Sequence, residues 1–175
     1  KLSSSGGGLF GNSCPIHPLL QFLSKIDYVI GNPPYVTLYG RRDKKQSEAQ
    51  RIYYLEHYQQ FPASLKNGKI NYIMLFLENS LDFLKTGGLL SFILDVSFFE
   101  TAYLYTRKYL LEHTNLLSMD YNLADFEVAS GQLILKLMKG NLNPNNQVRL
   151  YNAETKEIQY VNQTQWCNPK DEYRL

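Results

Sequence analysis

Four consecutive residues, Asn32-Pro33-Pro34-Tyr35, carry groups that could hold and activate a planar amine. Asn32 has a side-chain carbonyl and Pro33 a backbone carbonyl, so together they could accept both hydrogens of an amino group. Such contacts favour a more tetrahedral nitrogen whose lone pair is exposed. The two prolines fix φ and hold the carbonyl in place, and Tyr35 offers an aromatic face to a planar ring.

The elements around this tetrapeptide predict an α/β fold. The tetrapeptide directly follows residues 26–31, a short apolar run rich in β-branched residues that predicts a buried strand. Helical periodicity predicts helices over residues 47–60, 71–85 and 103–111, and Gly87 is expected to adopt a left-handed conformation after the second of them. Further strands are expected at 89–94, 116–121, 132–138 and 147–151. This order predicts a parallel sheet with helical crossovers, completed by antiparallel strands.

Three blocks of this sequence resemble the S-adenosylmethionine-dependent amino-methyltransferases, and most closely the adenine-N6 DNA methyltransferases of the gamma class. The blocks are KIDYVIGNPPYV, NYIMLFLENSLDFLKTGGLLSFIL and DFEVASGQLILKLMK, within residues 25–139. The resemblance implies a Rossmann-like methyltransferase fold, S-adenosyl-L-methionine as cofactor and double-stranded DNA as substrate. It also implies direct methyl transfer to the N6 amine of adenine, without a metal, in a restriction-modification or phage-defence system.

The resemblance also implies roles for individual residues. Asn32 and Pro33 would orient the target amine, Pro34 would stiffen the loop, and Tyr35 would stack on the base, which must be flipped out of the duplex. Phe76 in the second block would lie against the adenine of the cofactor. Periodicity alone is equally consistent with Phe76 as a core residue.

Two further sets of residues have a possible role in DNA binding. Phe126 in the third block would sandwich the flipped base from the side opposite Tyr35. A basic cluster closely follows the tetrapeptide and could hold backbone phosphates, although a solvated loop is equally consistent with it. Its members are Arg41, Arg42, Lys44 and Lys45.

Gamma-class enzymes carry a glycine loop and an acidic residue for the cofactor upstream of this motif. The 31 residues before Asn32 contain neither on a credible strand. We therefore expect residues 1–24 to be a linker or upstream remnant, residues 25–140 the catalytic half of a methyltransferase domain, and residues 141–175 a polar hairpin or the start of the next domain. The upstream cofactor-binding segment and the downstream target-recognition domain would be missing. The isolated chain should then bind cofactor weakly, be inactive, and expose a sheet edge that could form a homodimer.

Composition excludes several other classes of protein. The chain has 175 residues, of which 44% are hydrophobic, and contains no apolar window near the roughly 18 residues of a spanning helix. A formal charge of +2 is too small for whole-protein attraction to nucleic acid. Cys14 and Cys167 lie near opposite ends without partners at metal-ligand spacing, so no metal site is predicted. We expect a cytoplasmic protein.

Two alternatives remain open from the sequence. One is a protein-glutamine or RNA N-methyltransferase, because planar amides and other nucleobase amines suit the same tetrapeptide. The other is a non-catalytic nucleic-acid-binding module that keeps a degenerate methyltransferase fold. Of the two aspartates near the motif, Asp27 is interpreted as structural, and the role of Asp95 at the end of a strand is left open.

Overall fold

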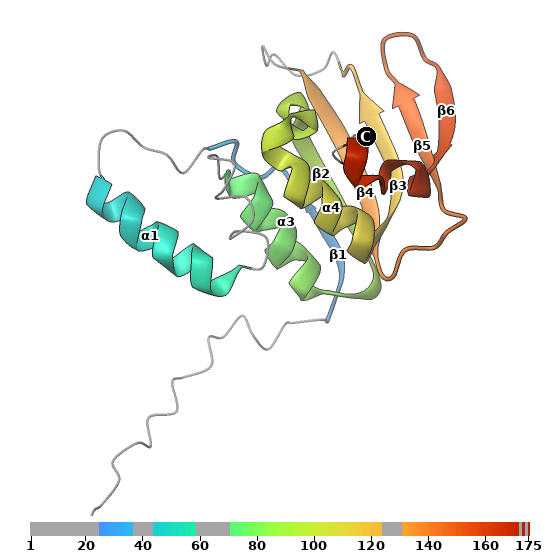
Figure 1. Ribbon diagram of the computed structural model, residues 1–175. Helices are drawn as coiled ribbons and strands as arrows, with labels where there is room; N and C mark the ends of the chain where they lie inside the picture. The colour runs from blue at the N-terminus through green and yellow to red at the C-terminus, as the bar shows by residue number, and fades with distance from the viewer. Residues whose placement is uncertain (1–24, 37–43, 59–70, 124–130, 172, 174) are drawn as a thin grey trace, which may run out of the picture.

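The computed structural model describes residues 25–36, 44–58, 71–123, 131–171, 173 and 175. Six strands form one mixed sheet in the order β1-β2-β4-β3-β5-β6 (Figure 1). The strands are β1 (Ile26–Gly31), β2 (Leu84–Asp95), β3 (Thr114–Tyr121), β4 (Gln132–Lys139), β5 (Gln147–Asn152) and β6 (Ile158–Asn162). The α-helices are α1 (Lys44–His57), α3 (Tyr72–Phe83) and α4 (Leu104–His113), and four 3-10 turns cover Val96–Phe99, Thr101–Tyr103, Gln163–Trp166 and Pro169–Asp171.

The sheet combines parallel and antiparallel pairs. β1 pairs in parallel with β2 and β3 with β5, whereas β4 runs antiparallel to both of its neighbours and β6 runs antiparallel to β5. This confirms the predicted Rossmann-like α/β class, with parallel strands completed by antiparallel ones. The strand expected at 147–151 is β5, which pairs directly with β3.

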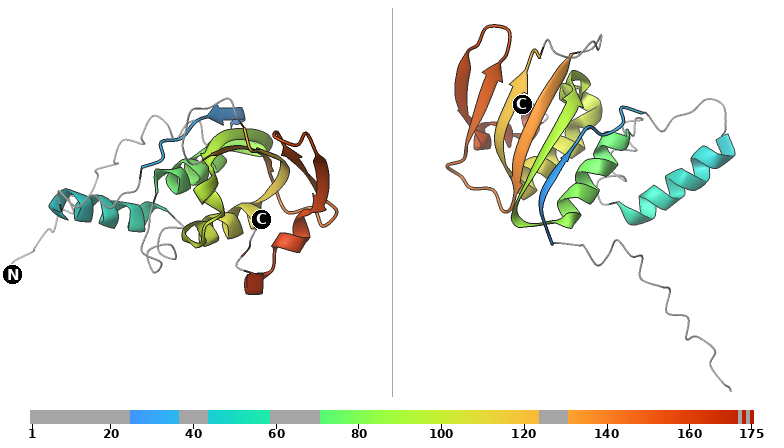
Figure 2. Two further views of the ribbon diagram at one scale, coloured as in Figure 1. Left: turned by 90° about the horizontal axis from the view of Figure 1, so that it is seen from above. Right: turned by 180° about the vertical axis from the view of Figure 1, so that it is seen from behind.

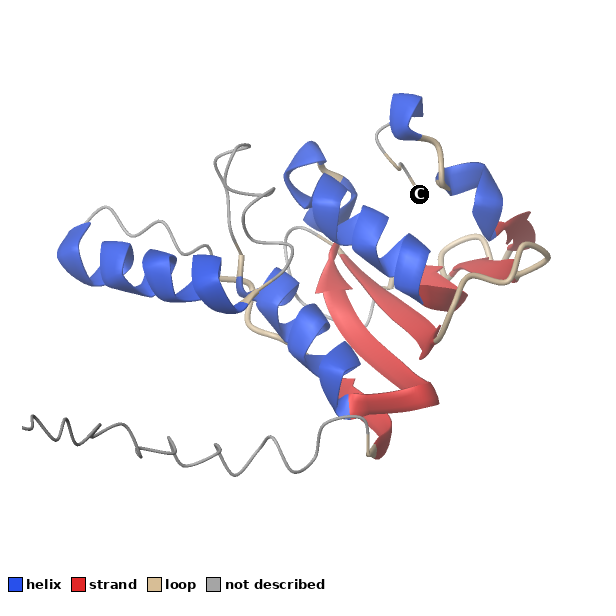
Figure 3. Cartoon of the chain, turned by 60° about the horizontal axis from the view of Figure 1, so that its bottom comes forward, coloured by secondary structure: helices blue, strands red, loops and turns tan. Residues whose placement is uncertain are grey.

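Helices α3 and α4 cover one face of the sheet, and the main core lies beneath them (Figure 3). Alternate residues of the central strands point into this core, as the two-residue period of a strand requires. The core side chains from β2, β4 and α3 include Leu90, Phe92, Leu94, Leu133, Leu135, Leu137, Ile73, Leu77 and Leu81. Seen from behind, the opposite face of the sheet carries no described helix (Figure 2).

The turn between α3 and the paired part of β2 depends on two glycines. Gly87 has a φ of 81°, so the expected left-handed conformation is confirmed, although α3 itself ends earlier, at Phe83. At Gly88 a Cβ would lie 2.9 Å from the Lys85 carbonyl oxygen and 3.1 Å from that of Ile26. The backbone therefore approaches closely where β1 begins to pair with β2.

Two buried polar side chains attach the carboxy-terminal part of the chain to the sheet and to α4. The Gln163 amide accepts a hydrogen bond from the Leu116 backbone N–H at 2.8 Å and donates one to the Thr114 carbonyl at 2.9 Å. Arg107 of α4, which is buried, donates to the backbone carbonyls of Phe98 and Tyr173. Because buried backbone groups need partners, these contacts hold the last residues against the domain.

Candidate active site

The Asn-Pro-Pro-Tyr segment lies at the carboxyl end of the edge strand β1. The neighbouring parallel strand β2 ends at Asp95 on the same sheet edge, where β4 begins at Gln132, the register partner of Asp95. β3 ends at Tyr121 on this edge as well, paired with Leu133. The carboxyl ends of β1, β2 and β3 therefore converge there, which is where ligands bind in open α/β sheets.

Gly31 lets the chain leave β1 close to its neighbour. A Cβ on Gly31 would meet the Phe92 ring at 3.3 Å, a tighter approach than side chains usually make. Asn32 and Pro34 are exposed, Pro33 is buried, and Tyr35 is half-buried with its ring packed against the core. Pro33 and the Tyr35 ring are therefore packed against the domain, whereas Asn32 and Pro34 are open to solvent.

The side chains of Asn32 and Tyr35 are hydrogen-bonded to each other. The Tyr35 hydroxyl lies 2.6 Å from Asn32 Oδ1, to which it donates, and 3.0 Å from the backbone carbonyl oxygen of Ile93 on β2. Burial of the ring, with a smaller contribution from the negative charge of Asp95, raises the pKa of Tyr35. The hydroxyl therefore keeps its hydrogen throughout the physiological range.

A cavity of about 330 Å³ opens between β1 and α3. Asn32 and Pro33 line it together with Phe76, whose side chain is 43% exposed. The other lining residues are Val29, Ile30, Gly31, Asn79, Ser80, Phe83 and Phe92. The structure therefore brings Phe76 to the same cavity as Asn32 and Pro33, whereas Pro34 and Tyr35 are not among its lining residues.

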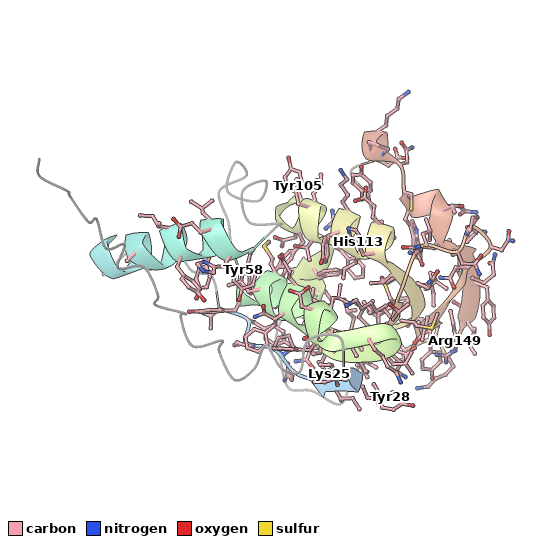
Figure 4. The ribbon with its side chains drawn as sticks, turned by 90° about the horizontal axis from the view of Figure 1, so that it is seen from below. Lys25, Tyr28, Tyr58, Tyr105, His113 and Arg149 are labelled. Carbon is pink, nitrogen blue, oxygen red and sulfur yellow. The ribbon has the colours of Figure 1, made fainter. Side chains whose placement is uncertain are left out.

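Asn79 is a polar member of this cavity that the sequence analysis did not single out. It lies three residues after Phe76 on α3, so helical spacing places both on one face. Its Nδ2 donates to the Tyr58 hydroxyl at 2.8 Å, and Figure 4 shows Tyr58 between α1 and α3. The i, i+3 spacing from Phe76 was the signal that could have found it.

The structure assigns a local role to each of the two aspartates near the motif. Asp95 Oδ1 accepts a hydrogen bond from the Ser97 backbone N–H at 2.8 Å and so caps the 3-10 turn after β2. Asp27, interpreted as structural, forms an exposed ion pair with Lys85. Among the described residues, no three His, Cys, Asp or Glu side chains are grouped where they could hold a metal ion.

Several predicted site residues lie outside the described part of the chain. These are Phe126, Arg41 and Arg42, together with the side chains of Lys44 and Lys45 at the start of α1. The described residues on either side of Phe126, Tyr121 at the end of β3 and Gln132 at the start of β4, lie at the sheet edge where Asn32 lies. The roles of the residues outside the described part stay predictions.

The outer side of β1 exposes apolar residues. Tyr28 is 67% and Ile30 82% exposed, and Figure 4 shows Tyr28 on the side of β1 away from α3. Within the described sheet β1 pairs only with β2, which leaves its outer edge without a strand partner. None of the described helices is long and apolar enough to cross a membrane.

Comparison with protein families identifies the group to which this arrangement belongs. The model of the Eco57I restriction-modification methylase family matches residues 20–128, more than half of the chain and including the whole tetrapeptide. The chain belongs to this family. No curated protein matches it.

Solved structures with the same fold include restriction-modification proteins and a protein described as a methyltransferase. The type IIG restriction endonuclease BpuSI superposes with a TM-score of 0.59 at 17% identity, over 83% of this chain and 20% of that one. A type I restriction-modification methyltransferase subunit from Streptococcus thermophilus gives 0.54 at 18% identity, over 86% and 30%. A protein described as a class I S-adenosylmethionine-dependent methyltransferase from Listeria monocytogenes gives 0.51 at 20% identity, over 73% and 36%.

These similarities show that the fold is that of the Rossmann-like methyltransferases. The chain matches only about a third or less of each of these three structures.

Proposed function

We propose that the protein containing this chain transfers a methyl group from S-adenosyl-L-methionine to the N6 amine of adenine in double-stranded DNA, in a restriction-modification system. The observation that carries this proposal is the shared cavity of Asn32, Pro33 and Phe76 at the carboxyl end of β1. Membership of a restriction-modification methylase family supports the same reaction class.

The residues of the tetrapeptide would act on the target amine by hydrogen bonding. Asn32 Oδ1 and the Pro33 carbonyl would accept its two hydrogens, which raises the reactivity of a nitrogen whose lone pair is otherwise delocalised into the ring. Pro33 and Pro34 preorganise these acceptors, so little reorganisation is needed during the reaction. The Tyr35 ring would contact the face of the base.

The cavity fits the adenine part of the cofactor better than its charged part. Phe76, Phe83 and Phe92 supply aromatic and apolar surface for a flat ring, and none of the described lining residues is charged. The bound cofactor would supply a methyl group on a positively charged sulfur. Its ribose hydroxyls and its amino acid end need hydrogen-bonding and charged partners from elsewhere.

We therefore propose that a segment outside this chain completes the cofactor site. The exposed outer edge of β1 and the apolar side chains of Tyr28 and Ile30 form a surface on which further strands and helices could pack. The limited share of the three related structures that this chain covers supports such a division. A downstream target-recognition domain would select the DNA site.

Product analysis tests the reaction. The complete protein would be incubated with S-adenosyl-L-methionine and, in separate reactions, with double-stranded DNA, RNA or a glutamine-containing peptide, and the products identified by mass spectrometry. N6-methyladenine is the expected product. Methylated glutamine in a peptide substrate, a methylated base in RNA only, or no product at all would each overturn the proposal in favour of one of the alternatives.

Calorimetric titration tests the division of the cofactor site. S-Adenosyl-L-methionine would be added to this chain alone and to the complete protein. Binding by the complete protein only is expected. Micromolar binding by this chain alone would show that its own residues suffice, and the proposed outside segment would then be wrong.

A further inference from the structure

The Tyr35 hydroxyl is placed to act on Asn32 as well as to anchor its own ring. It donates to Asn32 Oδ1 at 2.6 Å and lies 3.0 Å from the Ile93 carbonyl oxygen. A hydroxyl has one hydrogen, so it can donate fully to only one of these oxygens at a time. The shorter contact identifies Asn32 as the main acceptor, and the longer contact to the Ile93 carbonyl shares the same hydrogen in a three-centre bond.

This contact matters because the two ends of an asparagine amide have nearly the same shape. Packing alone does not decide which end faces a given direction, and hydrogen bonds do. Asn32 is exposed, so little packing restrains its amide. In this structure the Tyr35 hydroxyl donates to Asn32 Oδ1, which holds the oxygen, and not the NH2 group, on the side of Tyr35.

We propose that the Tyr35 hydroxyl is a positioning group that keeps the Asn32 side-chain oxygen, and not its nitrogen, at the place where the target amine binds. This inference rests on the proposed function. The carbonyl oxygen has two lone pairs, so it can accept from Tyr35 and from the amine together. If the amide turned over, its NH2 group would meet the N–H groups of the target, and the two sets of donors would repel.

The rigid framework around the hydroxyl supports this role. The ring of Tyr35 packs against the core, the two prolines restrict the backbone that links it to Asn32, and β2 supplies the Ile93 carbonyl. The raised pKa of Tyr35 keeps the hydroxyl a donor up to alkaline pH. The hydroxyl position is therefore set by three separate constraints.

Kinetics of paired variants in the complete protein test the proposal. Tyr35→Phe keeps the ring and removes the hydroxyl, and it should lower kcat about tenfold, the effect of one lost charge-neutral hydrogen bond, while KM for DNA stays the same. Asn32→Asp presents an oxygen at both ends of the side chain, so orientation no longer matters. In an Asn32→Asp background, the further change Tyr35→Phe should lower kcat less than about twofold.

Two kinetic results would overturn the proposal. One is a kcat for Tyr35→Phe within about twofold of the parent. The other is that Tyr35→Phe lowers kcat by the same factor in the Asn32→Asp background as in the parent, which would show that the hydroxyl acts through another group. Tyr160→Phe, which removes an exposed hydroxyl from β6, outside the cavity, is the matched control.

A spectroscopic measurement separates this inference from the proposed reaction. In protein labelled with 15N-asparagine, the Asn32 side-chain NH2 resonances, assigned with Asn32→Ala, should shift in Tyr35→Phe and not in Tyr160→Phe. Unchanged resonances would refute the positioning role even if methylation occurs. A shift without any methylated adenine from the parent protein would sustain the Tyr35–Asn32 contact and refute the reaction.

Discussion

Phe76 on α3 and Asn32, which directly follows β1, line the same cavity although they are far apart in the sequence. The arrangement joins the residue proposed to touch the cofactor with the residue proposed to hold the target amine. A methyl transfer needs these two partners next to each other. Their separate effects on binding and on rate can therefore be measured.

Phe76→Ala should weaken cofactor binding without unfolding the protein. The ring is 43% exposed, so its removal takes little from the core, but it removes a stacking surface in the cavity. We expect the KM for S-adenosyl-L-methionine in the complete protein to rise about tenfold. Leu117→Ala, at a partly exposed position on β3 outside the cavity, is the control and should leave that KM unchanged.

Asn32→Ala should abolish methylation and leave DNA affinity nearly intact. Asn32 would contact the amine most strongly in the transition state, and its exposed side chain contributes little to the core. Single-turnover rates and DNA-binding isotherms of the complete protein measure the two effects. Activity that survives within about threefold of the parent would refute the proposed role.

Charge reversal at Arg41 and Arg42 should weaken DNA binding and flatten its dependence on salt. Each lost phosphate contact reduces the number of counterions released on binding. Fluorescence anisotropy at several salt concentrations gives the slope. A salt dependence equal to that of the parent protein would show that Arg41 and Arg42 do not contact DNA phosphates.

Gly88→Ala should destabilise the domain by about 1–3 kcal/mol. The added Cβ would lie 2.9 Å from the Lys85 carbonyl oxygen, so the backbone must shift where β1 meets β2. Urea titration measures the free energy of unfolding. Thr86→Ala, an exposed position in the same turn, is the control, and an equal free energy for both variants would contradict the steric explanation.

Ionisation of the buried Tyr103 side chain should lower the free energy of unfolding at alkaline pH. Burial raises its pKa to about 12, and hydrogen bonds with Ser97 and Asn71 reduce that effect only partly. The unfolded tyrosine loses its proton near pH 10, as a free phenol does. Between about pH 10 and 12 the folded state holds more protons, so its stability falls as the pH rises, whereas below pH 10 this group has no effect.

Thermal unfolding across pH 9 to 12 checks that sign. Tyr103→Phe should show a smaller loss of stability in this range than the parent protein. Tyr160→Phe, which removes a hydroxyl from an exposed position, controls for the loss of one phenol. An identical pH profile in the parent and in Tyr103→Phe would assign the effect to other groups.

Local sequence patterns predict much of the fold and part of the site. The strand expected at residues 26–31 is β1 without change, and the helix carrying Phe76 is α3. Both elements can be predicted because the spacing of apolar residues over a short stretch of sequence indicates a strand or a helix. The strand expected from residue 89 begins earlier, at Leu84. The first residues of this strand are set by the close approach of the backbone at Gly88 to β1, which the side-chain pattern does not reveal.

Other features depend on partners that no local pattern reveals. The Tyr35 hydroxyl meets the backbone carbonyl of Ile93, which lies 58 residues away and could belong to any residue type. The pairing of β5 with β3 likewise depends on sheet order. Sequence indicates which groups could react, and the sheet determines which of them meet.

The edge position of β1 also has a consequence for the order of folding. β3 and β4 form a hairpin from neighbouring segments, whereas β1 pairs with a strand 58 residues further along, as Ile26 with Leu84 shows. Closing that longer loop costs more entropy, and among the described strands β1 pairs on one side only. We therefore expect the strand that carries Asn32 to join the sheet late and to open first in native-state fluctuations. The Asn-Pro-Pro-Tyr segment would then be less protected than the central strands until a further strand covers β1.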